Sequence, residues 1–314
     1  MTIIPNRFSL GTGALKINSM AMFRQTIAVF FIGYMTSALA LPFGSRHVLV
    51  VDEGSGTVLL EKNADVTVPI ASLTKLMTAM VVLDSNPDMD EAICIEAPEV
   101  ATRKRSRSRI PLGTSLPRKT VLQLALMSSD NSAAASLARA YPGGDAAFNA
   151  ALKDKLTMLE MTHTTIEEPT GLSGNNKSTA TDLVKMVEAA AHYPDIARIT
   201  TDSRDIIDIN GRPVEYRNTN RLVGQKGWGI LLSKTGFTTP AGRCLVMRLQ
   251  SAGKTVIMVL LNAKASSTRK IDALNVRRFL AGGRNLIEKV AQFNRAQFAV
   301  HHDHLQLAET EPSH

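Results

Sequence analysis

The sequence predicts an α+β fold, because strand-like segments lie near both ends of the chain and helical segments fill the middle. Residues 47–53 and 57–61 are β-rich and are joined by Gly54-Ser55-Gly56, which indicates a hairpin. Turn residues separate three further β-rich runs, at 228–235, 240–250 and 254–262. Strands so far apart in the chain, with helices between them, indicate one sheet with a helical insertion.

Helical patterns account for most of the middle of the chain. Residues 118–159 indicate several helices, interrupted at Ser128-Ser129 and again at residues 141–144. Residues 166–178 are rich in turn formers and are expected to form a loop. Single helices are expected over residues 73–84, 179–192 and 269–281.

The first 40 residues have the pattern of a secretory signal peptide. Arg24 precedes an apolar stretch, residues 27–35, and residues 36–40 end in a small-x-small site. We therefore expect export to the periplasm and cleavage after about Ala40. The alternative is a retained anchor helix, because the uncharged run over residues 25–45 approaches the roughly 20 residues that span a bilayer.

Composition excludes the fibrous and wholly disordered classes. The 314 residues are 44% hydrophobic and 20% charged, as in an ordinary enzyme-sized chain. The formal charge is +8, of which three units lie in residues 1–40. Five basic residues also cluster within residues 103–109. Export and the lack of interleaved aromatic residues argue against nucleic-acid binding, and leave a solvated basic face or contact with an anionic wall polymer.

Neither the cysteines nor the histidines indicate a metal or cofactor site. Cys94 and Cys244 are the two cysteines, and whether they pair stays open. Cys244 begins an apolar strand-like run, so a buried unpaired thiol is expected there. The sequence has no C-x-x-C and no H-E-x-x-H, so we expect neither a metal nor another cofactor.

The first candidate catalytic motif is S-x-x-K at Ser72 and Lys75, at the start of an expected helix. Residues i and i+3 share a helix face, so the lysine amine can take the proton of the serine hydroxyl once its pKa is lowered. The pattern is weak alone, because Ser251 and Lys254 match it at a turn between strands.

Two further motifs follow in the chain. Ser129-Asp130-Asn131 lies at a helix break, where a hydroxyl and an amide would be side by side, although a helix N-cap is an equally ordinary explanation. Lys234-Thr235-Gly236 ends a strand-like run, and its glycine leaves room for a substrate backbone. The order S-x-x-K, S-x-N, K-T-G is far more specific than any one motif.

With these motifs the sequence resembles the penicillin-recognising serine peptidases, the low-molecular-mass penicillin-binding proteins. It looks most like the D-alanyl-D-alanine endopeptidase branch, of the penicillin-binding protein 7 type, over about residues 45–281. The resemblance implies an antiparallel sheet flanked by helices with an all-helical subdomain, as in β-lactamases and DD-peptidases. The segments that carry it are residues 71–79, 125–131, 169–172, 218–222, 233–237 and 241–247.

The resemblance also implies catalytic roles. Ser72 would be the acylated nucleophile, Lys75 its general base and Ser129 the relay that brings a proton to the leaving amine. Asn131 would bind the substrate peptide. Repulsion from Lys234 would help to keep Lys75 neutral at pH 7.

The remaining candidate residues would bind the substrate. Lys234 and Thr235, next to Gly236, would hold its carboxylate side, and the backbone N–H groups of Ser72 and Phe237 would form an oxyanion hole. Arg243 could bind a carboxylate or could be a surface strand charge, so it is a secondary candidate. The implied partners are peptidoglycan peptide stems and, as covalent inhibitors, β-lactams.

Two alternatives stay open. Class A β-lactamases share the three motifs but need a glutamate in E-x-x-L-N, whereas the stretch from Glu168 to Ser173 has its leucine one position late and a serine in place of the asparagine. We therefore expect slow release of β-lactams. The second alternative is a non-catalytic protein that binds the cell wall.

The expected domains are a signal peptide over residues 1–40, a catalytic domain over 41–281 and a tail over 282–314. The tail is loosely amphipathic, which favours a helix packed on the domain over weak contact with a membrane surface. The sequence leaves undecided the balance of endopeptidase and carboxypeptidase activity, the cross-linked diamino acid, the oligomeric state and the true start codon.

Overall fold

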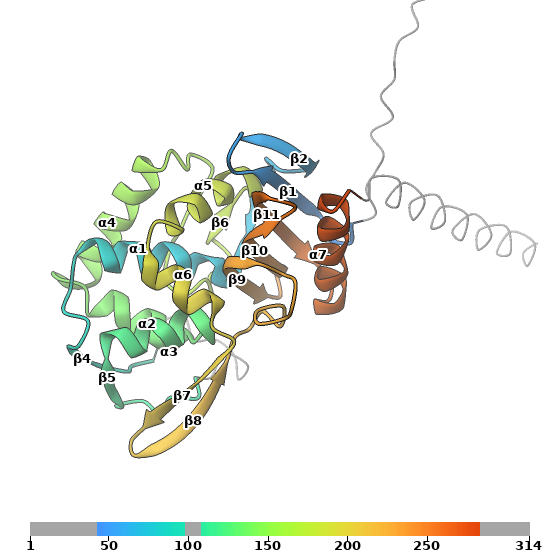
Figure 1. The fold of residues 1–314 in the computed structure, drawn as a ribbon. Coiled ribbons are helices and arrows are strands. Elements are labelled where there is room, and N and C mark those ends of the chain that lie inside the picture. Colours follow the sequence, from blue (N-terminus) through green and yellow to red (C-terminus); the bar gives the residue numbers. More distant parts are fainter. Residues whose placement is uncertain (1–42, 98–107, 283–314) are drawn as a thin grey trace, which may run out of the picture. The chain divides into compact units, whose positions relative to one another are not determined.

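The computed structural model describes residues 43–97 and 108–282, drawn in colour in Figure 1. These residues belong to one compact unit. The expected signal peptide, most of the basic run and nearly all of the tail lie outside the described residues. No helix among the described residues is long and apolar enough to cross a membrane.

A five-stranded antiparallel sheet forms the frame of the fold (Figure 1). The first two strands in the chain pair with the last three, as the sequence predicts. The strand order is β2 (Thr57–Lys62), β1 (His47–Asp52), β11 (Lys254–Ala263), β10 (Gly242–Ser251) and β9 (Ile230–Thr238). The K-T-G motif therefore lies on an edge strand, and within that strand rather than at its end.

The two faces of the sheet pack against different layers, because successive side chains of a strand point to opposite faces. Val48 and Val50 of β1 pack with Ala273 and Val276 of α7 (Ser266–Leu280). Their neighbours on β1, including Leu49, face the core shared with the other helices. The structure is thus the predicted α+β fold, an antiparallel sheet with helices on both faces (Figure 1).

Helix α1 (Thr74–Asp84) lies at the centre of the helical part and is buried along nine consecutive residues, 74–82. A helix that is buried all round must be surrounded by others. A 3₁₀ turn, η1 (Ala71–Leu73), leads directly into it. The surrounding helices are α2 (Arg118–Met127), α3 (Asn131–Arg139), α4 (Gly144–Met158), α5 (Ala180–Ala190) and α6 (Pro194–Thr201).

Three two-stranded ribbons complete the described structure. They are β3 (Val68–Pro69) with β6 (Lys177–Ser178), β4 (Ala92–Cys94) with β5 (Ser115–Pro117), and β7 (Arg204–Ile209) with β8 (Arg212–Arg217). The β7–β8 hairpin and α6 were not predicted. The signal was present, because Asn210 and Gly211 form the turn with φ values of 55° and 77°, as a type I′ hairpin requires.

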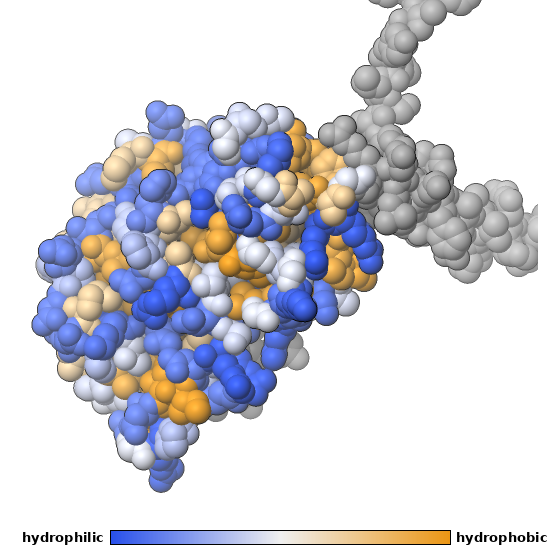
Figure 2. Space-filling model, in the orientation of Figure 1, coloured by the Kyte–Doolittle hydropathy of each residue, from blue (hydrophilic) through white to orange (hydrophobic). Residues whose placement is uncertain are grey.

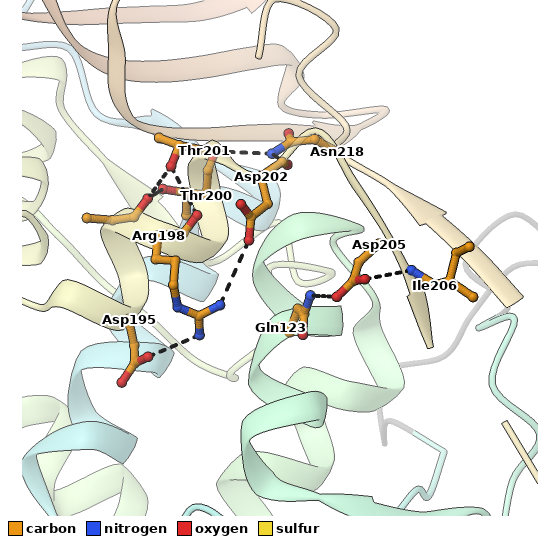
Figure 3. A network of polar contacts seen from close by, with 10 residues as sticks. Gln123, Asp195, Arg198, Thr200, Thr201, Asp202, Asp205, Ile206 and Asn218 are labelled. Carbon is orange, nitrogen blue, oxygen red and sulfur yellow. Dashed lines mark hydrogen bonds and ion pairs between the residues drawn. The ribbon is translucent and has the colours of Figure 1, made fainter. Parts of the chain in front are cut away.

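Polar contacts fix the base of the β7–β8 hairpin to the helical part (Figure 3). The side-chain amide of Asn218 donates to the carbonyls of Thr200, at 3.1 Å, and Asp202, at 2.9 Å. On the other strand, the amide of Gln123 in α2 donates to the carboxylate of Asp205 at 2.5 Å. The hairpin is therefore held from both strands.

Both cysteines are free thiols. Cys244 is buried in β10, as predicted, and burial raises its pKa to about 11, so its thiol is not reactive at neutral pH. Cys94 is exposed on β4. The face in Figure 2 is mostly hydrophilic, with apolar residues in small separate groups.

Candidate active site

Ser72 lies in the 3₁₀ turn that begins α1, and its side chain is half-buried. The turn is tightly enclosed. Gly171, with φ +84°, passes so close that a Cβ there would lie 2.1 Å from the Ala71 carbonyl oxygen and 2.8 Å from the Ser72 nitrogen. Glycine is therefore needed at position 171 to let the loop support the turn that carries the serine.

Lys75 lies one helical turn after Ser72 and is buried, with 1% of its surface exposed. Its Nζ is 3.1 Å from Ser72 Oγ. It also donates to Asn131 Oδ1 at 2.7 Å and to the Thr170 carbonyl oxygen at 2.6 Å. These contacts hold the amine in one position against the serine hydroxyl.

Burial lowers the pKa of Lys75 to about 8, while the nearby carboxylates of Glu168 and Asp130 oppose the shift. Desolvation, rather than repulsion from Lys234, is thus the main reason that Lys75 is easily deprotonated, which corrects the emphasis of the sequence-based argument. A neutral amine keeps two N–H groups, which can donate to Asn131 Oδ1 and to the Thr170 carbonyl oxygen. Its lone pair is then directed at Ser72 Oγ.

The Ser129-Asp130-Asn131 motif forms the junction between α2 and α3. Asp130 is the N-cap of α3, and its carboxylate accepts from the Ala133 N–H at 3.0 Å. The N-cap expectation is therefore met at Asp130, while Ser129 and Asn131 make hydrogen bonds with the two lysines. Ser129 has φ +61°, an unusual value for serine, so the junction is strained at the residue whose hydroxyl faces Lys234.

Lys234 on β9 is also buried, with 1% exposure. Its Nζ donates to Ser129 Oγ at 2.8 Å and to the Thr235 carbonyl oxygen at 3.1 Å. Burial, and after it the positive charge of Lys75, lowers the pKa of Lys234 well below its ordinary value. Each serine therefore has a buried lysine beside it, Lys75 at Ser72 and Lys234 at Ser129, and the two lysines repel each other when both are charged.

Gly236 lets β9 lie against the turn that carries Ser72. A Cβ at Gly236 would be 2.8 Å from the Ile70 carbonyl oxygen and 3.1 Å from the Ser72 nitrogen. One residue earlier, Thr235 donates its hydroxyl to Thr219 Oγ1 at 2.7 Å. The backbone of the K-T-G strand is thus next to the Ser72 N–H, the arrangement that an oxyanion hole requires.

Arg243 and Phe237 are paired residues on β10 and β9. The Arg243 guanidinium carbon lies 3.6 Å from the centroid of the Phe237 ring, whose residue is 44% exposed. A stacked guanidinium keeps its edge free for a carboxylate. Stacking on Phe237 thus places the Arg243 guanidinium beside the last residues of the K-T-G strand.

Glu168 lies in the loop before Gly171, and both oxygens of its carboxylate accept hydrogen bonds from other residues of that loop. Its Oε1 accepts from the N–H groups of Gly171, at 2.7 Å, and Ser173, at 3.2 Å, and its Oε2 accepts from the N–H and hydroxyl of Thr170 at 2.8 and 2.5 Å. By binding Thr170, Glu168 fixes the position of the Thr170 carbonyl, which accepts from Lys75. It does not have the free oxygen that would orient a water molecule for rapid deacylation.

The structure brings the predicted residues together in two linked groups, Ser72 with Lys75 and Asn131, and Ser129 with Lys234. Sequence analysis did not single out Thr170 and Thr219, although both lie in segments that carry the family resemblance. Thr170 acts through its backbone carbonyl, which no sequence motif marks. Among the described residues, no group of three or more His, Cys, Asp or Glu side chains is placed to hold a metal ion.

Comparison with known proteins gives a family and close relatives. The family described as D-alanyl-D-alanine carboxypeptidase matches residues 35–265. A protein of Pseudomonas aeruginosa named D-alanyl-D-alanine endopeptidase is 44% identical over 76% of this chain and 78% of its own length. One of Escherichia coli with the same name is 41% identical over 79% of this chain and 81% of its own length.

Solved structures agree with these relatives. The DD-transpeptidase of Streptomyces K15 superposes with a TM-score of 0.67 at 25% identity, over 76% of this chain and 97% of its own. Penicillin-binding protein D2 of Listeria monocytogenes, in its cefotaxime-bound form, gives a TM-score of 0.66 at 26% identity over 76% of this chain and 97% of its own.

Proposed function

Because the chain belongs to the D-alanyl-D-alanine carboxypeptidase family of serine peptidases, we propose that it cleaves D-alanyl bonds of peptidoglycan through an acyl-enzyme on Ser72. The observation that carries this is the 3.1 Å contact of Lys75 Nζ with Ser72 Oγ, made by an amine whose pKa is lowered to about 8. A base must be both within hydrogen-bond reach and deprotonated near the working pH, and Lys75 meets both conditions.

In the acylation step, neutral Lys75 takes the proton of Ser72, and Oγ forms a bond to the carbonyl carbon of the D-alanyl residue. The carbonyl electrons move to its oxygen, where the backbone N–H groups of Ser72 and Phe237 would stabilise the negative charge. Only the 3₁₀ turn and the adjoining K-T-G strand are needed to supply both donors, and the closeness of Gly236 to Ser72 supports this.

Collapse of the tetrahedral intermediate breaks the C–N bond, and the leaving amine needs a proton. Ser129 is suited to deliver it, because its Oγ lies 2.8 Å from Lys234 Nζ, which can restore the proton to the serine. The proton that Lys75 took from Ser72 replaces the one that Lys234 gave up, which leaves Lys75 neutral again. Water then attacks the ester and gives a proton to Lys75, which passes it to the departing Ser72 oxygen and so regenerates the hydroxyl.

The substrate would be held on both sides of the scissile bond. Asn131 offers its amide to the peptide backbone, while Lys234 and Thr235 face the carboxylate side. Arg243, stacked on Phe237, adds a second cation at the end of the same strand. Both relatives reported above bear the name endopeptidase, which supports cleavage of cross-links as the main activity.

We also propose that β-lactams acylate Ser72 and inhibit the protein. A relative of the same fold has been solved with cefotaxime bound, and the internally bonded Glu168 lacks a free oxygen to speed release of the acyl group. Because both carboxylate oxygens of Glu168 are already hydrogen-bonded, the class A β-lactamase alternative is disfavoured as well.

The site of action we propose is the periplasm, after removal of residues 1–40. The support is the sequence pattern of a basic flank at Arg24, an apolar core and a small-x-small site before Ala40. Determination of the N-terminus of the secreted protein by mass spectrometry tests this, and an intact N-terminus in membrane fractions would favour an anchor instead.

Digestion of purified muropeptides by the mature protein tests the activity. Conversion of cross-linked dimers to monomers is expected, whereas loss of only a terminal D-alanine would make the protein a carboxypeptidase. Absence of any D-alanyl cleavage, in a preparation that is folded by circular dichroism, would leave the non-catalytic wall-binding alternative.

A further inference from the structure

A polar pocket of about 470 Å³ adjoins the Ser129–Asn131 junction on the side of strand β8. The catalytic cycle proposed above uses Ser129 and Asn131 but assigns no role to the rest of this pocket. The lining residues that matter here are Arg109, Asp130, Tyr216 and Arg221, together with Ser129 and Asn131. They come from four separate segments, so the fold assembles this pocket rather than one loop.

Tyr216 on β8 is 1% exposed, and its hydroxyl has no hydrogen-bond partner within the part of the chain that the structure describes. A buried hydroxyl without a partner is unfavourable, so such a group calls for a water molecule or a ligand to complete it. Burial also raises the pKa of Tyr216 above its ordinary value, so the hydroxyl keeps its proton and can donate.

The acceptors of the pocket are already occupied by the protein itself. Asp130 accepts from the Ala133 N–H and, at 2.7 Å, from the Ser108 hydroxyl. Glu215 is paired with Arg217 at 2.9 Å and with Arg204 at 3.5 Å. The oxygens of both carboxylates are therefore already hydrogen-bonded within the protein, and the charge of Asp130 acts on Lys75.

The polar groups of the pocket that have no partner within the described residues are hydrogen-bond donors. The Arg221 side chain is exposed and makes no ion pair or hydrogen bond with any other described residue, and the Asn131 amide N–H is likewise unused. Arg109 stacks on Tyr216, with its guanidinium carbon 4.3 Å from the ring centroid, and adds positive charge at the rim. A pocket with spare donors, spare cations and saturated acceptors is complementary to an anion with acceptor oxygens.

We propose that this pocket binds a carboxylate of the peptidoglycan peptide that lies outside the scissile bond and is distinct from the one facing Lys234 and Arg243. This inference rests on the proposed function. Tyr216 and Arg221 would donate to the carboxylate oxygens. Because Ser129 and Asn131 form the wall shared with the catalytic site, a substrate peptide can reach both sites at once.

The anchoring of the β7–β8 hairpin supports a preformed pocket. Asn218, two residues after Tyr216, is fixed by the carbonyls of Thr200 and Asp202, as Figure 3 shows. Tyr216 is therefore held before a ligand arrives, which reduces the entropy lost on binding.

The test compares two forms of one cross-linked muropeptide dimer, the free acid and a form in which the carboxylates away from the scissile D-alanyl linkage are primary amides. We expect kcat/KM of the wild type to favour the free acid by about tenfold, as a charge-assisted hydrogen bond would produce. Arg221→Gln should reduce the preference to less than about twofold, through KM. Arg212→Gln, an exposed arginine at the turn of the same hairpin, is the matched control and should retain the preference.

Tyr216→Phe separates binding from stability. Because the hydroxyl has no internal partner, its removal should leave the melting temperature unchanged or slightly raised while the preference falls about threefold. Equal rates on acid and amide by an active wild type would overturn this inference alone. So would an equal loss of preference in Arg212→Gln, or a lowered melting temperature in Tyr216→Phe. Cleavage of neither form, with no labelling by penicillin, would overturn the proposed function and this inference with it.

Discussion

Lys75 Nζ lies 3.1 Å from Ser72 Oγ, whereas the S-x-x-K match at Ser251 and Lys254 makes no such hydrogen bond. Lys254 instead donates to the carboxylate of Asp52 across the sheet at 2.5 Å. The difference arises because Ser72 and Lys75 share one helical turn inside the core, while Ser251 and Lys254 bound the tight turn between β10 and β11. The same four-residue pattern is therefore chemically distinct in the two places.

This contrast provides the first prediction. Ser72→Ala should abolish both cleavage of muropeptides and covalent labelling by a fluorescent penicillin, because the acylated oxygen is gone. Ser251→Ala is the matched control from the second motif and should label as the wild type does. Labelling is read on a denaturing gel. A labelled Ser72→Ala protein would mean that another residue is the nucleophile.

The second prediction concerns pH. Only the deprotonated form of Lys75 can accept the proton of Ser72, and its pKa is lowered to about 8 by burial. The acylation rate by a penicillin should therefore rise with pH and reach half its maximum at about pH 8. Stopped-flow measurement of acylation across a pH series checks this. A rate that falls as pH rises through this range would require a protonated group in place of a base.

The third prediction changes the charge beside Lys75. Asn131 Oδ1 accepts from Lys75 Nζ at 2.7 Å, so Asn131→Asp would put a carboxylate in direct contact with the amine. An opposite charge so close should raise the pKa of Lys75 by about one unit or more. The midpoint of the acylation profile should move to higher pH by the same amount. Asn149→Asp, on the exposed side of α4, serves as the control for added charge and should leave the midpoint in place.

The fourth prediction concerns the fate of the acyl-enzyme. Glu168 is hydrogen-bonded to backbone and side-chain donors of its own loop, so it cannot act as a base for fast deacylation. Nitrocefin should give a burst of about one molecule hydrolysed per protein chain, followed by slow turnover. Absorbance measurements at several protein concentrations check the stoichiometry. Rapid linear turnover without a burst would support a β-lactamase.

Much of the fold was predictable because its patterns are local. The strands of the central sheet are apolar runs separated by Gly-containing turns, and α1 and α5 have clear helical periods. The β7–β8 hairpin was missed because its strands are exposed and rich in charge, as in Arg204 to Ile209, so alternation with a buried face is weak. The Asn210-Gly211 turn carried the stronger signal there.

The candidate site divides in the same way. The side chains that we propose act chemically, such as Ser72 and Lys234, belong to short motifs that can be recognised in a sequence. The Thr170 carbonyl and the Tyr216 hydroxyl acquire their significance only from tertiary packing, since one contacts a buried amine and the other is buried without a partner. The source of the lowered pKa of Lys75 also needed the structure, because burial cannot be measured from spacing.

The last prediction concerns the loop at Gly171, which supports the turn that carries Ser72. A Cβ at this position would lie 2.1 Å from the Ala71 carbonyl oxygen, and the φ of +84° is unfavourable for any other residue. Gly171→Ala should therefore lower the free energy of unfolding by about 2–4 kcal/mol and displace the turn that carries Ser72. Gly56→Ala has a similar φ of +67° but nothing within 4 Å of the added Cβ, so it should cost only about 1 kcal/mol and keep full labelling by penicillin. Urea unfolding of both variants measures their free energies of unfolding. The loss in Gly56→Ala reports the cost of the positive φ alone, and the additional loss in Gly171→Ala reports the steric clash with Ala71. Equal losses of stability would show that backbone conformation, rather than the close approach of the loop to Ala71, is what requires glycine at position 171.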